Sequence, residues 1–159
     1  MSVNGRLVHR VISVTPVITA EAYTTGQVLG AQTKINLAVA GLDYIPESGV
    51  IRNVTVICPD DVAPSIDIFI YSKAPTQQAT KATLDVPDAD AAKYIARLVL
   101  ANTVFTDLGG ATVGILQGQY IPFMKDPTSD GIYVQLVCRG SHTFTSVAGL
   151  QLKFGIQLD

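Results

Sequence analysis

Charged side chains are scarce in this chain. Asp, Glu, Lys and Arg make up 15% of its 159 residues, whereas about 25% is typical of proteins in general. Hydrophobic residues make up 48%. A monomer of this composition presents an unusually uncharged surface to water, and two explanations are open. Part of the surface is buried in the interfaces of an assembly, or the surface is polar but uncharged, built from Thr, Gln, Ser and Asn.

Clusters of positive charge and long apolar segments are also missing. Every Lys and Arg is isolated in the sequence, and the formal net charge is −2, so the electrostatic attraction that drives nucleic-acid binding is absent. No apolar run approaches the roughly 18 residues of a membrane-spanning helix. The first residues lack the continuous apolar core of a secretory signal. We therefore expect neither nucleic acid nor a membrane as a partner.

Residues with catalytic or metal-binding chemistry are few. The two histidines, His9 and His142, have no partner at metal-ligand spacing, and His142 follows a turn, where we expect it to be solvated. Neither a Gly-x-Ser-x-Gly elbow nor a glycine-rich phosphate loop is present. The acidic segments 60–61 and 126–130 suit either a bound cation or ordinary turn chemistry. The sequence predicts no enzyme, no resident metal and no cofactor.

The two cysteines, Cys58 and Cys138, each end an apolar alternating run, and neither belongs to a Cys-x-x-Cys pair. This placement favours two small, buried, reduced thiols. A disulfide between neighbouring strands is the alternative.

Strand patterns dominate the rest of the chain. Alternation of apolar and polar residues predicts strands at 50–58, 66–71, 132–138 and 150–158, with turns rich in Gly, Pro and Asp between them. In the first of these strands, the pattern places Val50, Arg52 and Val54 on one face, with Val56 and Cys58. In the second it places Ile66, Ile68 and Ile70 together. Such strands and turns are typical of a β-sandwich or barrel.

Two segments depart from this pattern. Pro87 followed by Asp88 and Asp90 is typical of a helix start, and we expect one short helix near 87–94. Residues 1–20 are apolar and β-prone but irregularly spaced, and Pro16 interrupts them. They form an extended arm or edge strand, suited to pairing with a neighbouring chain, or the ordinary first strand of the sandwich. The predicted organisation is an arm over 1–20 and a β-sandwich domain over 21–159.

Three segments resemble motifs of a family of small virion proteins from tailed bacteriophages. Residues 23–30 are similar to the family's Tyr-x-x-Gly-Asp-hydrophobic-hydrophobic-Gly motif. Residues 65–71 with 74–76 are similar to its Asp-Leu-x-x-Phe…Asn-Pro-Thr segment, and residues 88–95 to its Asp-x-Asp-x-x-Lys run. The last two predicted strands also fit. The resemblance extends from Tyr23 to the C-terminus and departs where Tyr-Ser-Lys-Ala replaces the family's Phe-Asp-x-Asn.

The resemblance implies an all-β fold, namely a β-sandwich of the jelly-roll type, with no catalytic residues. It also implies that the chain decorates or cements a phage capsid by binding across major capsid subunits. The expected partners are the major capsid protein and further copies of this chain in a homotrimer. The expected location is the outer surface of the virion, after synthesis in the host cytoplasm.

In this interpretation, the N-terminal arm and one face of the strand at 66–71 meet the neighbouring subunits. Phe69 and Tyr71 lie opposite the isoleucine stripe, and either cover the second sheet or meet a partner. The predicted contact residues are Val8, Val11, Ile12, Val14, Phe69 and Tyr71. The alternative function is a carbohydrate-binding or host-surface-binding jelly-roll module of the virion, for which Tyr71, Tyr120 and Tyr133 are the candidate aromatic platforms.

Overall fold

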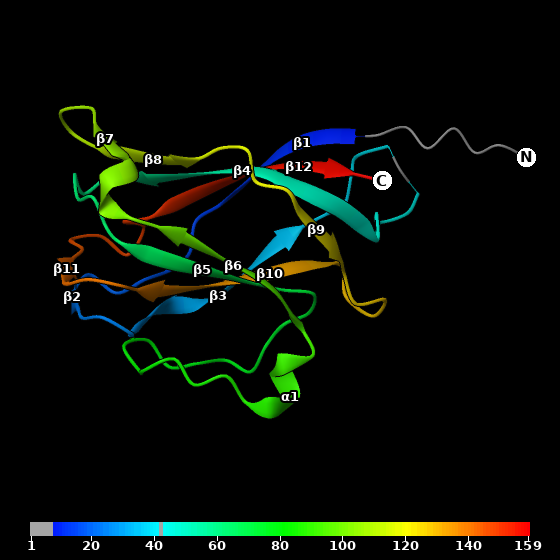
Figure 1. Ribbon diagram of the computed structural model, residues 1–159, viewed down its shortest axis with the longest axis horizontal. Helices are drawn as coiled ribbons and strands as arrows, with labels where there is room; N and C mark the ends of the chain where they lie inside the picture. The colour runs from blue at the N-terminus through cyan, green and yellow to red at the C-terminus, as the bar shows by residue number, and fades with distance from the viewer. Residues whose placement is uncertain (1–7, 42) are drawn as a thin grey trace, which may run out of the picture.

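The computed structural model describes residues 8–41 and 43–159, which form two antiparallel β-sheets packed face to face (Figure 1). One short helix, α1 (Asp88–Ala91), and one 3-10 turn, η1 (Asn102–Val104), accompany the strands. The strands are β1 (Val8–Val14), β2 (Ala22–Tyr23), β3 (Val28–Asn36), β4 (Ser48–Cys58), β5 (Ile66–Tyr71), β6 (Tyr94–Leu100), β7 (Phe105–Asp107), β8 (Thr112–Leu116), β9 (Ile121–Met124), β10 (Gly131–Cys138), β11 (His142–Thr143) and β12 (Gln151–Leu158). The predicted all-β sandwich with one short helix is confirmed.

The six-stranded sheet has the order β1-β12-β4-β8-β7, and the four-stranded sheet has the order β3-β10-β5-β6. β9 also belongs to the larger sheet, since it pairs with the first half of β4 while β8 pairs with the second half. β8 and β9 therefore lie end to end along one edge of β4. A small third sheet joins β2 and β11.

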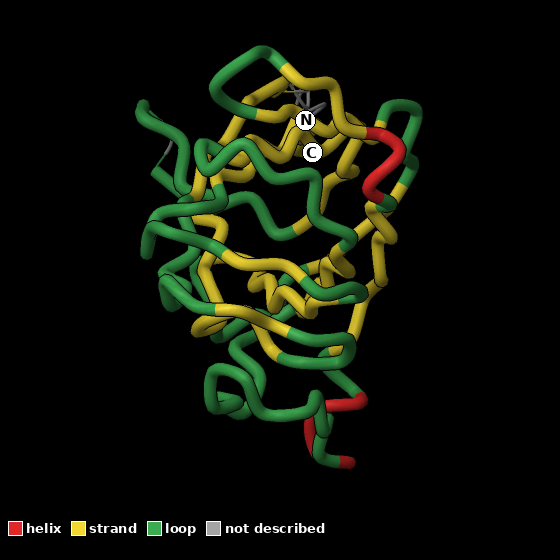
Figure 2. Tube along the Cα trace, turned by 90° about the vertical axis from the view of Figure 1, so that its left-hand side faces the viewer, coloured by secondary structure: helices red, strands yellow, loops and turns green. Residues whose placement is uncertain are grey.

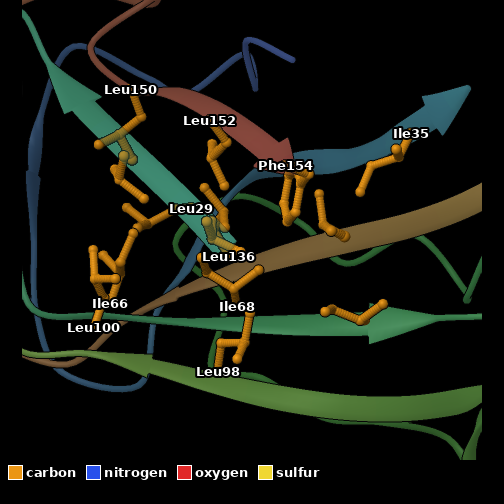
Figure 3. Close-up of a cluster of buried hydrophobic side chains, with 14 of the residues drawn as sticks. Leu29, Ile35, Ile66, Ile68, Leu98, Leu100, Leu136, Leu150, Leu152 and Phe154 are labelled. Atoms are coloured by element: carbon orange, nitrogen blue, oxygen red, sulfur yellow. The ribbon is translucent and has the colours of Figure 1, made fainter. Parts of the chain in front are cut away.

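The core lies between the two main sheets (Figure 3). Leu152 and Phe154 of β12 face Ile68 and Leu136 of the four-stranded sheet, and all four side chains are at most 1% exposed. Burial of each such side chain stabilises the fold by about 1.5–3 kcal/mol. The alternation predicted for 150–158 is confirmed, because every second residue from Leu150 to Leu158 belongs to this core.

Residues 72–93, here named the covering loop, carry α1 and lie over β3, β10 and the end of β5 on the outer face of the four-stranded sheet (Figure 2). Tyr94 and Val99 of β6 stay 46% and 52% exposed. Backbone hydrogen bonds join this loop to β3 at Val28, which donates to the carbonyl of Ala82 and accepts from Lys81. Tyr71, predicted as a contact residue, lies beneath the loop and is 1% exposed. Tyr71 is therefore covered by the loop and not by the second sheet, and the predicted partner contact would need the loop to move.

A β-bulge in β4 corrects the predicted face assignment. In the pairing of β12 with β4, Gly155 lies opposite Asn53 and Ile156 lies opposite Ile51, which leaves Arg52 as an extra residue. The bulge reverses the alternation, so that Ile51 belongs to the core together with Val54, Val56 and Cys58. Val50 and Arg52 therefore do not share the buried face with Val54, as the period of two had predicted.

The N-terminal segment is an edge strand of the chain's own sheet over the part that the structure describes. β1 pairs antiparallel with β12, from Val8 opposite Leu158 to Val14 opposite Leu152. The arm predicted over 1–20 is therefore not free of the sandwich over Val8–Val14, and its residues 1–7 lie outside the described residues.

Both cysteines are buried and unbridged, Cys58 at the end of β4 and Cys138 at the end of β10. Burial raises the pKa of each thiol, which keeps the sulfur protonated and unreactive. The expectation of two reduced thiols in the core is confirmed. Within the described residues, no helix has the length and apolar character needed to cross a membrane.

Candidate functional site

The outer face of the six-stranded sheet is not covered by any described helix or strand, and lies opposite the covering loop (Figures 1 and 2). Large hydrophobic side chains are exposed on it, from β1 through the centre to β8 and β9. We name this surface the open face. Its exposed hydrophobic residues are Val11 (69%), Ile115 (45%), Tyr120 (72%) and Met124 (70%).

The open face is hollowed where the bulge interrupts the sheet. β8 ends at Leu116 and β9 begins at Ile121, and the segment between them is bound to the bulge because the Gln119 N–H donates to the Arg52 carbonyl at 2.9 Å. Two shallow hollows, of about 450 and 240 Å³, both have Arg52 and Asn53 in their lining. The larger extends toward β8 and Tyr120, and the smaller extends toward β1. Together they form a depression across the middle of the sheet.

Arg52 has a fixed orientation at the centre of this depression. Its Nε and Nη2 both donate to Oε1 of Gln157, at 3.2 and 2.6 Å. The guanidinium carbon lies 4.4 Å from the ring centroid of Tyr120, a cation–π contact. Gln157 is uncharged, so these contacts orient the guanidinium without neutralising it. Arg and Tyr are also the residue types most often responsible for binding energy at interfaces.

The hollows carry positive charge and no negative charge. Arg52 belongs to the lining of both hollows, which contains no Asp or Glu, and Lys153 of β12 lies opposite Thr55. Arg10 also borders the smaller hollow, but its guanidinium donates to the carbonyl of Ala38, which follows β3. In the part of the chain that the structure describes, all six ion pairs include a residue of the four-stranded sheet or of the covering loop. The two outer faces of the sandwich are therefore electrostatically different.

Two of the three segments that carry the family resemblance meet at the buried carboxylate of Asp90, in a cluster here named the Asp90 clamp (Thr76, Asp90 and Lys93). The Asp90 carboxylate accepts a hydrogen bond from Lys93 Nζ at 2.5 Å and one from the Thr76 N–H at 2.6 Å. Lys93 Nζ also donates to the carbonyl of Ala74 at 3.1 Å. The hydrogen bonds to the carboxylate, chiefly the one from Lys93, lower the pKa of Asp90. The clamp holds the covering loop closed, so these motif residues are structural.

The remaining segment of the resemblance is structural too. Gly30 has a φ of +69°, and a Cβ atom there would collide with the backbone carbonyl of Val17, so only glycine fits this position. The hydroxyl of Tyr23 accepts from the N–H of Thr19 at 2.9 Å. The ring of Tyr23 packs edge-on against Phe144, with the ring centroids 5.9 Å apart.

The six predicted contact residues are not brought together in space. Val11 alone lies on the open face, while Val8, Ile12 and Val14 are partly buried against the core. Phe69 is half-buried on the far side of the sandwich, where it and Tyr71 each pack against Tyr94 with ring centroids 6.4 and 6.2 Å apart.

The central residues of the open face, Arg52 and Asn53, were not predicted as site residues. An alternating pattern in β4 gives no sign of a bulge, and Tyr120 was predicted only as a candidate sugar platform.

His142 and the acidic turns have local structural roles. Nε2 of His142 accepts from the Ser65 N–H at 2.9 Å, and burial lowers the pKa of this half-buried imidazole, so the expectation of a solvated side chain is wrong. Asp60 accepts from Thr145 and Ser146, and Asp126 accepts from Thr128 at 2.8 Å. In residues 8–41 and 43–159, no group of three or more metal-ligating side chains is found.

Chemically, the open face offers one fixed guanidinium, amide groups and exposed apolar side chains around a shallow depression. Such groups suit binding, because the guanidinium can neutralise a charged group of a partner and the amide and apolar groups can position it. Comparison of the chain with models of protein families and with curated proteins finds no match.

Proposed function

We propose that this chain is a structural protein of a tailed-phage virion, which decorates the capsid and stabilises it by binding across major capsid subunits. The observation that carries the proposal is the open face, where exposed hydrophobic side chains surround a fixed arginine. The opposite face of the sandwich is covered in part by the chain's own loop (Figure 2). A protein with an open face of this kind suits attachment to a larger surface.

The strand order supports a jelly roll. With the short edge strand β7 left out and β8 and β9 counted as one interrupted strand, the two sheets read β1-β12-β4-β8 and β3-β10-β5-β6. The chain alternates between the sheets from β1 to β5 and again from β6 to β12, as it does when two Greek keys wrap around one core. Together with the three resembling segments, this order favours the virion family over an unrelated sandwich.

A cement protein stabilises a capsid through linkage. It binds the assembled shell more tightly than the separate subunits, so its binding free energy adds to the stability of the shell. At a free concentration one hundred times the Kd, this contribution is about 2.7 kcal/mol per site. Copies repeated by capsid symmetry, as homotrimers on the outer surface of the virion, multiply the effect.

The test is addition of the purified protein to undecorated shells of the same phage. We expect the protein to co-sediment with the shells in a fixed ratio and to raise their melting temperature, while unassembled capsid subunits bind it weakly. A protein that leaves both the sedimentation and the melting of the shells unchanged would refute the proposal.

A carbohydrate-binding or host-surface-binding module is the second candidate. The ring of Tyr120 is exposed beside the amide side chains of Asn53, Gln117 and Gln119, which line the same hollow. Aromatic rings and amides together suit the apolar and hydroxyl faces of a sugar. Retention on a polysaccharide column, with no affinity for shells, would favour this function over capsid decoration.

A further inference from the structure

Arg52 is prepared for an anion that the chain itself does not supply. Its Nε and Nη2 donate to Gln157, and its guanidinium carbon lies over the ring of Tyr120. Hence little side-chain entropy remains to be lost when a ligand binds. In the described part of the chain, no carboxylate lies within ion-pair distance of this guanidinium. By contrast, Arg97 and Arg139 on the other side of the molecule both contact Asp67.

The surroundings of Arg52 favour a negative partner. Lys153 lies on the neighbouring strand β12, and no acidic residue lines either hollow. A surface of one charge sign attracts a complementary surface and disfavours a basic one. Charge complementarity therefore identifies the occupant as an acidic group.

The shape and the apolar residues identify the occupant further. The depression extends from Val11 on β1, past Gly155 and Asn53, to Ile115 and Tyr120. Gly155 keeps its floor open, because a Cβ atom there would lie 2.5 Å from the Asn53 side chain. Hydrophobic side chains at both ends suit a peptide segment, whose own apolar residues would flank its carboxylate, better than a small inorganic anion.

We infer that the open face is the docking surface for a carboxylate-bearing peptide segment of a capsid subunit, with Arg52 binding the carboxylate. The apolar residues of that segment pack on Val11, Ile115 and Tyr120. This inference rests on the proposed function, and it adds the surface that is used and the chemistry of the partner. It also orients the protein on the shell, with the six-stranded sheet inward and the covering loop outward.

The first experiment compares Arg52→Gln with a matched control, Arg97→Gln. Both variants lose one positive charge, but Arg97 lies on β6, away from the open face. We expect Arg52→Gln to raise the Kd for undecorated shells at least tenfold, as truncation of a hot-spot arginine does, and to weaken the salt dependence of binding. We expect Arg97→Gln to bind as the wild type does. Thermal melts of both variants show whether each is folded.

The second experiment needs neither shells nor a variant. The wild-type protein is titrated, with NMR observation, with the acetylated and amidated peptide Gly-Asp-Leu-Asp-Gly and with its Asn counterpart. We expect the acidic peptide alone to shift the Arg52 Nε–H and the Tyr120 ring signals, and we expect added salt to suppress the shifts.

The outcomes separate the inference from the proposed function. If wild-type protein binds shells and Arg52→Gln binds them equally well, the docking surface is wrong although capsid decoration stands. If the wild type does not bind shells but the acidic peptide shifts the Arg52 signal, the open face does bind carboxylates and the proposal of capsid decoration is wrong. Equal shifts with the Asn peptide, or shifts with a neutral oligosaccharide only, overturn the inference.

Discussion

Replacement of Asp90 by Asn removes the charge of the Asp90 clamp while keeping its size. The Asp90 carboxylate is 1% exposed and accepts two short hydrogen bonds, from Lys93 Nζ and the Thr76 N–H. Loss of one partner from a buried ion pair costs about 3–5 kcal/mol when the other charge stays buried. Lys93 is 29% exposed, so its ammonium can turn to water. We therefore expect a smaller loss, of about 2–3 kcal/mol, mainly from the weakened bonds.

We expect this loss of free energy to destabilise the covering loop more than the core. The clamp joins Thr76 to α1, so we expect the loop to open locally before the sandwich unfolds. Hydrogen exchange at the Thr76 amide measures that opening, and urea denaturation measures the global free energy of unfolding. Asp88→Asn is the matched control, since Asp88 is exposed on the same turn, and it should cost no more than about 0.5 kcal/mol. Equal effects of the two substitutions would refute the role of the clamp.

The pH dependence of the same variant gives a second check. Because the pKa of folded Asp90 lies below the ordinary value of 3.8, chiefly through Lys93, its ionised form stabilises the folded protein above that pH. This contribution is lost as the pH falls through the lowered pKa. The difference in unfolding free energy between the wild type and Asp90→Asn should therefore be largest near neutral pH and shrink in acid. A difference that is constant with pH would contradict the ionic character of the clamp.

Three further predictions concern the fold. Gly30→Ala should cost about 3 kcal/mol in a urea melt, from a left-handed backbone and a collision with the main chain. Gly109→Ala, also at positive φ but with open space around it, should cost only about 1–2 kcal/mol. Because burial holds the pKa of His142 below 6.5, thermal stability should fall as the pH drops below that value, and His142→Gln should reduce this dependence. Phe154→Ala should destabilise the core by about 3–5 kcal/mol in the same urea assay, without moving the bulge.

The elements that the sequence predicts well are those whose pattern is local. β12 alternates without interruption, and β10 is apolar on both faces because it is central and covered on both sides. The short helix near 87–94 follows from Pro87 and the acidic residues after it. β8 and β9 were not predicted, because Gly114 and Pro122 interrupt the alternation of apolar and polar residues in these strands.

The candidate site depends on features that local patterns do not contain. The bulge at Arg52 exists because β12 offers one residue fewer than β4 at that point, a property of two strands about a hundred residues apart in the chain. Tyr71 has the outward, apolar position that alternation predicts, but the loop that buries it is specified by the Asp90 clamp. Sequence reasoning therefore predicted the β-sandwich but not which of its two outer faces is open.

An image of shells decorated with this protein, at a resolution that places side chains, tests the central claim most directly. We expect the open face to lie against the capsid subunits, with Arg52 in contact with a subunit carboxylate and the covering loop directed away from the shell. Attachment through the covering loop or through the edge of β6, with the open face in solvent, would contradict the account.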